Sequence, residues 1–174
     1  MRKVIGISVT VLLVAFLAAC AGREMSSEPM STMSSESAMP AANGQAVIDY
    51  ITKDSPYQQW SLWPGKGKLY PGTRPHGAFL TTYVNQSALK GIEEQGGELP
   101  DGAIIVKENY MPDKTLAAVT VMYKKAGYNP PAKDIFWLKY TPDGKIAAEG
   151  KVNSCIGCHG AAKGGDFLYT NDGM

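Results

Sequence analysis

The strongest constraint on the fold is a succession of short apolar segments between residues 78 and 152. Residues 78–85 alternate between two sets of side chains, and residues 116–124 are rich in Val and Thr. Pro-Asp-Gly sequences at residues 100–102 and 142–144 are turn signals. The expected strands are residues 78–85, 103–110, 116–124, 134–140 and 145–152, with short helices at residues 45–53 and 87–95. Without long helices between the strands, the sequence predicts an α+β, mainly β class: an antiparallel sheet with a few short packed helices.

The first twenty residues indicate export. Arg2 and Lys3 form a positive start, and residues 4–19 carry no charge, which is typical of the apolar centre of a signal peptide. This run ends in small residues before Cys20 and resembles a bacterial lipoprotein signal, with cleavage before Cys20 and lipid on its thiol. An uncleaved N-terminal anchor is the alternative. Both place the folded part outside the cytoplasm, and we expect a lipid-anchored protein on the periplasmic face of a membrane.

The next segment has the composition of a tether. Residues 20–43 mix Ser, Met, Glu and Pro without a period of 2 or 3.6, so we expect them to be disordered. Their methionines would suit Cu(I), but no histidine accompanies them. We therefore divide the chain into a signal peptide (residues 1–19), a tether (residues 20–43) and one domain (residues 44–174). The net charge of +1 provides no electrostatic footprint for nucleic acid.

A C-x-x-C-H sequence lies close to the C-terminus, at Cys155, Cys158 and His159. Two thiols at this spacing can each add to one vinyl group of haem, and the adjacent histidine can then bind the iron. The sequence thus predicts one haem c per chain, attached through Cys155 and Cys158 and with His159 as the iron ligand. A zinc site would need a fourth ligand, and a redox disulfide is the other alternative. Lipid on Cys20 and haem on the other two would account for all three cysteines.

The order of four segments resembles the cytochrome P460 family. They are Tyr83-Val84-Asn85, residues 99–109, the strand Ile135–Tyr140 with its Pro142-Asp143 turn, and the late C-x-x-C-H. The resemblance runs from about Trp60 past Cys158. It implies a β-rich domain, usually a homodimer, whose high-spin haem has an open or ligand-exchanging distal face. One kind of member oxidises hydroxylamine and has a lysine cross-linked to the haem, whereas the cytochrome c-prime-beta kind binds nitric oxide or carbon monoxide in an apolar pocket.

Lys107 occupies the position of the family's cross-linking lysine. The resemblance implies a haem-binding and catalytic residue there, whereas a strand lysine commonly faces solvent. Hydroxylamine-oxidising members also carry a distal carboxylate on the following strand, but in this chain residues 119–124 contain no Asp or Glu. Tyr123 or Met122 takes the approximate position, and neither is a good base near neutral pH. Tyr123 is the candidate catalytic residue there, and the missing carboxylate weakens the oxidase hypothesis.

His76 is the second of the two histidines in the chain. It follows Arg74-Pro75 and enters a strand whose family counterpart supplies an apolar distal residue. Three roles remain open for it: a surface loop residue, a distal hydrogen-bond donor or base, and a second axial ligand. Of these, only ligation would close the iron to substrates.

Two functions of different class follow. The first is an exported mono-haem c-type cytochrome whose accessible distal site binds or redox-processes a small nitrogen ligand, such as nitric oxide or hydroxylamine. Turnover of that ligand would make the protein a hydroxylamine or nitric-oxide oxidoreductase. The second is a membrane-tethered electron carrier with His76 as second axial ligand and no substrate. Both require a redox partner protein, and the resemblance adds a homodimer.

Overall fold

The computed structural model describes residues 38–94, 98–162 and 165–169. The expected signal peptide, Cys20 and most of the expected tether lie outside these ranges. Among the described residues, no helix has both the length and the apolar character needed to cross a membrane.

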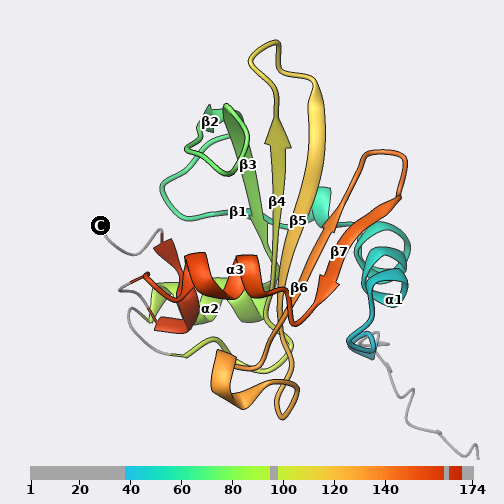
Figure 1. Cartoon of the computed structure of the whole chain (residues 1–174), viewed down its shortest axis with the longest axis vertical. Helices are drawn as coiled ribbons and strands as arrows, with labels where there is room; N and C mark the ends of the chain where they lie inside the picture. Colours follow the sequence, from blue (N-terminus) through green and yellow to red (C-terminus); the bar gives the residue numbers. More distant parts are fainter. Residues whose placement is uncertain (1–37, 95–97, 163–164, 170–174) are drawn as a thin grey trace, which may run out of the picture. The chain divides into compact units, whose positions relative to one another are not determined.

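The described chain is organised around a seven-stranded antiparallel sheet (Figure 1). Five strands follow one another as a meander, and two short ones, β1 and β2, pair with the outer side of β3. The strands are β1 (Ser61–Leu62), β2 (Tyr70–Pro71), β3 (Phe79–Val84), β4 (Ile104–Tyr110), β5 (Leu116–Lys124), β6 (Ile135–Tyr140) and β7 (Ile146–Gly150). This confirms the predicted mainly β class. The two-residue strands β1 and β2 are too short to produce a periodic signal, and they were not predicted.

Three short α-helices accompany the sheet: α1 (Gly44–Asp49), α2 (Gln86–Glu93) and α3 (Asn153–His159). A π-helical turn, Tyr50–Asp54, extends α1, and 3-10 turns lie at Tyr57–Gln59, Pro130–Ala132 and Gly165–Phe167. Asn43 caps α1 by accepting from the backbone of Ala46, and Asn85 caps α2 in the same way at Ala88. These caps explain why both helices begin close to the predicted residues.

The folded part begins earlier than the composition predicted. Met39 and Ala42, which the sequence assigned to the tether, pack against the core, and Pro40 is buried. The Tyr123 hydroxyl donates to the Pro40 carbonyl at 2.9 Å. Residues 38–43 therefore belong to the domain in the part of the chain that the structure describes.

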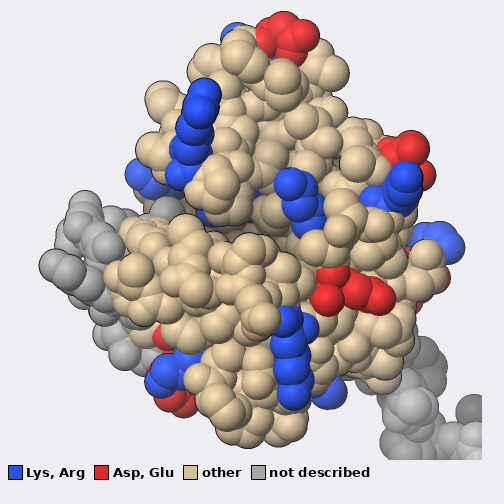
Figure 2. All heavy atoms as spheres, viewed as in Figure 1, with Lys and Arg blue, Asp and Glu red and all other residues tan. Residues whose placement is uncertain are grey.

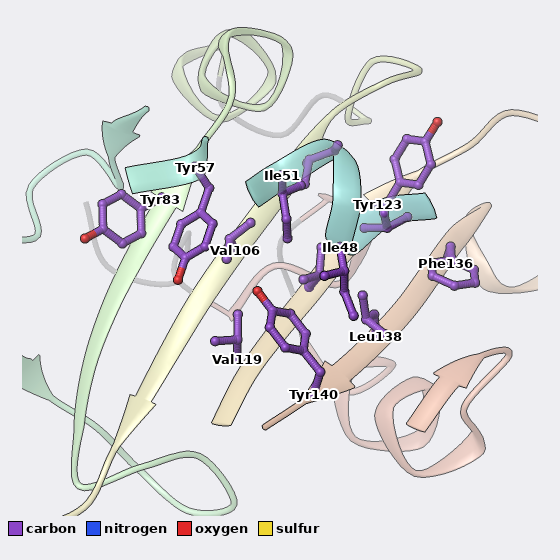
Figure 3. Packing of buried hydrophobic residues seen from close by; sticks show 13 residues of the cluster. Ile48, Ile51, Tyr57, Tyr83, Val106, Val119, Tyr123, Phe136, Leu138 and Tyr140 are labelled. Atoms are coloured by element: carbon purple, nitrogen blue, oxygen red, sulfur yellow. The ribbon is translucent and has the colours of Figure 1, made fainter. Parts of the chain in front are cut away.

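Alternation along the strands gives the sheet two different faces. One face packs against α1 and the π-helical turn, and we call its cluster the tyrosine core (Figure 3). It consists of Val47, Ile48, Ile51, Tyr57, Tyr83, Ile104, Val106, Val119, Val121, Tyr123, Phe136, Leu138 and Tyr140.

The opposite face carries the second cluster, which we call the tryptophan core. It gathers Trp63, Val84, Ala88, Ile92, Leu99, Ala103, Ile105, Met122, Ile135, Trp137 and Leu168, with partly buried side chains of α3 packed against it. Lys107 lies on this face with Ile105 and Asn109, as the strand alternation predicted. The sheet thus separates a closed core from the face that carries the predicted site residues.

Candidate haem site

A cavity of about 730 Å³ lies on the tryptophan face of the sheet. Its walls are the loop of residues 72–78, strands β4 to β6, helix α3 and residues 167–169. Figure 2 shows the surface hollowed between α3 and the upper parts of the strands, with Lys or Arg side chains close to the hollow. The volume falls within the roughly 300–1,000 Å³ typical of cofactor pockets.

Helix α3 presents the C-x-x-C-H side chains to this cavity. Cys155, Cys158 and His159 occupy positions i, i+3 and i+4, so they share one helix face, and all three line the cavity. No disulfide bond joins the two cysteines of this helix. No residue of α3 is fully buried, although the helix lies over the sheet. The helix is therefore positioned to hold a group between itself and the strands.

His159 is oriented by a backbone carbonyl. Its Nδ1 lies 2.8 Å from the Phe167 carbonyl oxygen, which can only accept, so Nδ1 carries the proton and Nε2 carries a lone pair. Burial lowers the pKa of His159 and favours this neutral ring. The Trp137 ring packs against it at a centroid distance of 4.7 Å.

The segment that supplies this carbonyl is itself fixed by a buried ion pair. Asp166 is 2% exposed and receives a hydrogen bond from the Leu99 backbone. Lys124 Nζ lies 3.1 Å from Asp166 Oδ2 and also donates to the Lys133 carbonyl. Lys124 thus ties the end of β5 to the residues that orient His159.

His76 lies on the other side of the cavity, at the end of the loop between β2 and β3. The loop is closed by hydrogen bonds from Gly72 to Ala78 and from His76 to Thr73, both between backbone groups. The His76 and His159 ring centroids are 6.2 Å apart, with an interplanar angle of 88°. Burial, reinforced by the charge of Lys107, lowers the pKa of His76 to about 4.

Lys107 lies on the sheet and lines the same cavity as the two histidines. Its strand neighbours are Thr82 on β3 and Thr120 on β5, and Lys139 follows one strand further at the same level. Burial lowers the pKa of Lys107, and its charge lowers the pKa of both histidines. A lysine on this face is close to any group held between the rings.

The structure does not bring Tyr123 to the site, and this corrects its expected catalytic place. Tyr123 is fully buried in the tyrosine core, on the opposite face of β5. Its neighbour Met122 lines the cavity instead, because successive strand residues point to opposite faces. Sequence reasoning also gave no site role to Asn109, Lys139 or Trp63, which all line the cavity. Trp137, expected as a core or haem-packing aromatic residue, lines it too. Asn109 and Lys139 could have been found by extending the Lys107 face to its strand neighbours.

The lining has a property that fits haem. Trp63 and Trp137 are each 3% exposed, and their indole N–H groups have no acceptor among the described residues. Together with Met122, these two aromatic side chains give the cavity a largely apolar wall, opposite the two thiols and the imidazole that α3 presents, and this combination suits a covalently attached haem. Cys155, Cys158 and His159 would hold haem, which supplies an iron that exchanges electrons and binds small ligands. The described residues contain no cluster of three or more His, Cys, Asp or Glu side chains placed to hold a bare metal ion.

A β-sheet domain with a Cys/Cys/His helix over a cavity of this size belongs to the class of c-type haem proteins. The comparison with protein families agrees: the sequence model described as Cytochrome P460 matches residues 55–170. The chain therefore belongs to the cytochrome P460 family, whose members are c-type haem proteins that are typically exported. No curated protein sequence matches the chain.

Proposed function

We propose that this protein is an exported cytochrome with one haem c per chain, which binds or redox-processes a small nitrogen ligand such as nitric oxide or hydroxylamine. Cys155 and Cys158 attach the haem and His159 binds its iron. The observation that carries the proposal is the cavity of about 730 Å³, which reaches from His159 on α3 to His76 and Lys107. A ligand on the side of the iron away from His159 would meet these two polar side chains.

Carbon monoxide tests the accessible site. The reduced protein is expected to bind carbon monoxide rapidly, with the change in the haem absorption spectrum that accompanies ligation of a five-coordinate or ligand-exchanging iron. A spectrum that is unchanged after prolonged exposure would contradict an accessible distal site. Hydroxylamine with an electron acceptor then distinguishes binding from turnover.

One observation favours a second candidate, an electron carrier in which His76 is the second axial ligand. A metal–imidazole bond is roughly 2 Å long, so two imidazoles on one metal ion have centroids about 6 Å apart. The observed separation is 6.2 Å. In this case the resting spectrum is low-spin and becomes high-spin in His76→Phe, whereas a wild-type protein that is already high-spin contradicts the second candidate.

We also propose that Lys107 contacts the haem. Its position on the cavity face supports this role, and its pKa is lowered by burial. Mass analysis of haem-bearing proteolytic peptides tests a covalent bond: the bond requires Lys107 to stay on the haem with the peptide that contains Cys155 and Cys158. Lys107→Arg, which retains the charge, is the matched control for its electrostatic effect.

Anchoring and assembly complete the proposal. Lipid on Cys20 would hold the domain at the periplasmic face of a membrane, where a redox partner protein exchanges electrons with it. A radiolabelled fatty acid is expected to be incorporated into the wild-type chain and not into Cys20→Ser, and a wild-type chain that stays unlabelled would contradict lipidation. A homodimer predicts twice the chain mass in light scattering of the haem-loaded protein.

A further inference from the structure

The side chain of Asn109 has a defined orientation beside His76. Its Nδ2 donates to the Lys107 carbonyl at 2.9 Å, the Ala118 carbonyl at 3.3 Å and Thr120 Oγ1 at 3.2 Å. A flipped amide would place its oxygen against two carbonyl oxygens, which cannot donate. The strands therefore turn Asn109 Oδ1, which can only accept, toward His76.

This orientation fixes the tautomer of His76. His76 Nδ1 lies 3.0 Å from Asn109 Oδ1, so Nδ1 must donate. A neutral imidazole has one N–H, and the lone pair is then on Nε2. His159 has the same tautomer, because its Nδ1 donates to the Phe167 carbonyl. In both histidines that line the cavity, the protonated Nδ1 thus donates to a protein oxygen, and Nε2 is unprotonated.

We propose that Asn109 is a positioning residue that holds His76 with its Nε2 lone pair available to the haem pocket, so that the distal face presents an acceptor. The inference rests on the proposed haem site and names the ligand class that suits it. An acceptor receives a hydrogen bond or a proton from a ligand that carries N–H or O–H, as hydroxylamine does, and it can also bind the iron. It gives no hydrogen bond to bound dioxygen. His76 and Asn109 together supply the acceptor that the missing carboxylate on β5 would have provided.

Nitrogen NMR of the haem-loaded protein tests the tautomer directly. Histidine is labelled with ¹⁵N and the reduced protein is kept under carbon monoxide, which gives a diamagnetic iron whether carbon monoxide or His76 is the sixth ligand. The His76 signals are identified by their loss in His76→Phe. The proton is expected on Nδ1, and a proton on Nε2 overturns the inference. If His76 holds the sixth position and carbon monoxide does not bind, the proposed accessible site is contradicted. The tautomer of His76 is still measured in that case, so the inference about Asn109 is tested separately.

The stretching frequency of bound carbon monoxide tests the role of Asn109. A distal N–H donor lowers this frequency, whereas a lone pair does not. The wild-type frequency is expected to lie at or above that of His76→Phe, and Asn109→Leu is expected to add a band at lower frequency as the ring is released. Thr120→Val is the matched control, because it removes one acceptor of Nδ2 but leaves Oδ1 in place. Equal shifts in Asn109→Leu and Thr120→Val, or none in either, would show that Asn109 does not set the tautomer.

Discussion

Two tyrosine hydroxyls, one buried and one partly buried, donate to a single buried carboxylate, Glu108, on the face of the sheet opposite the haem site. Tyr57 Oη donates to one Glu108 oxygen at 2.9 Å and Tyr110 Oη to the other at 2.7 Å. Glu108 is 6% exposed, and a buried carboxylate requires such donors. Burial first, and then the charge of Glu108, raises the pKa of Tyr57 and brings that of Tyr140 to about 12. The folded tyrosine core therefore favours the protonated form of these phenols over the phenolate.

This core predicts a loss of stability at alkaline pH. The unfolded chain releases phenol protons near pH 10, whereas the folded chain retains them. The stability contributed by Tyr140, and by Tyr123 with its pKa of about 12, is fully present below about pH 10 and is lost as the pH rises toward about 12. Chemical unfolding and phenolate absorbance, measured across this range, check the prediction. In Glu108→Gln the phenols of Tyr57 and Tyr140 should ionise at lower pH than in the wild type, and an unchanged titration contradicts the role of the Glu108 charge.

On the face of the sheet that carries the haem site, we expect removal of the Asp166 carboxylate to destabilise the protein strongly. Removing one partner of a buried ion pair leaves an uncompensated charge, so Asp166→Ala is expected to lower the free energy of unfolding by about 3–5 kcal/mol. The exposed pair between Lys133 and Glu98 is the control, with Glu98→Ala expected to cost less than about 1 kcal/mol. Denaturant titration of both variants measures the difference. Equal effects would mean that the buried pair does not hold residues 165–168 in place.

At the residue scale, the sequence predicted which residues belong to the site better than it predicted which of them touch. It selected Cys155, Cys158, His159, Lys107 and His76, and the structure brings all five to one cavity. Their distance in the chain explains what was missed. The pairing of His76 with Asn109 joins residues 33 positions apart, and it depends on strand register and amide orientation, which no local pattern encodes.

At the scale of elements, the loop of residues 72–78 places His76. Gly77 lies directly on the last residue of β4: a Cβ on Gly77 would lie 2.5 Å from the Tyr110 backbone nitrogen and 2.6 Å from its carbonyl oxygen. The loop is also tied there by a hydrogen bond from the Ala78 N–H to the Tyr110 carbonyl. Only a residue without a side chain allows this close approach.

Gly77→Ala is therefore expected to lift the loop from β4 and to move His76 away from Asn109. Overpacking of this kind costs about 1–3 kcal/mol of unfolding free energy. Gly67→Ala is the matched control, since no atom lies within 4 Å of a Cβ at that position. Denaturant unfolding and the haem absorption spectrum are measured for both variants. A spectrum that changes equally in both, or in neither, would show that contact with β4 does not place His76.

Elements with a strong period were predictable, and elements without one were not. Strand β5 occupies the predicted residues, and β3, β4 and β6 begin within one residue of the predicted start. Helix α3 was not predicted, because Asn153–His159 is short and has no apolar stripe of its own. Strand alternation also required that only one of Met122 and Tyr123 could reach the site, but the choice depends on which face of the sheet carries α3.

For the molecule as a whole, the sheet separates a core that is covered by its own helix from a core that borders an open cavity. The tyrosine core is closed by α1 and by residues 38–42. On the other face, α2 buries Ala88, Gly91 and Ile92, whereas α3 buries none of its residues and borders the cavity. A seven-residue helix is far below the length at which helices are stable alone. Haem attached to Cys155 and Cys158 would supply the packing that α3 lacks.

This difference predicts which part of the molecule depends on haem. In the full chain carrying Cys155→Ser and Cys158→Ser, amides of α3 should exchange with solvent rapidly, whereas β4 to β6 and α2 should remain protected. Helix α2 is the internal control, because it packs on the same face of the sheet but has buried residues of its own. Hydrogen exchange read by mass spectrometry, with the haem-loaded wild type as reference, measures both. Equal protection of α3 in the two proteins would mean that the helix is stable without haem. Loss of protection throughout β4 to β6 would mean that the tyrosine core cannot hold the sheet by itself.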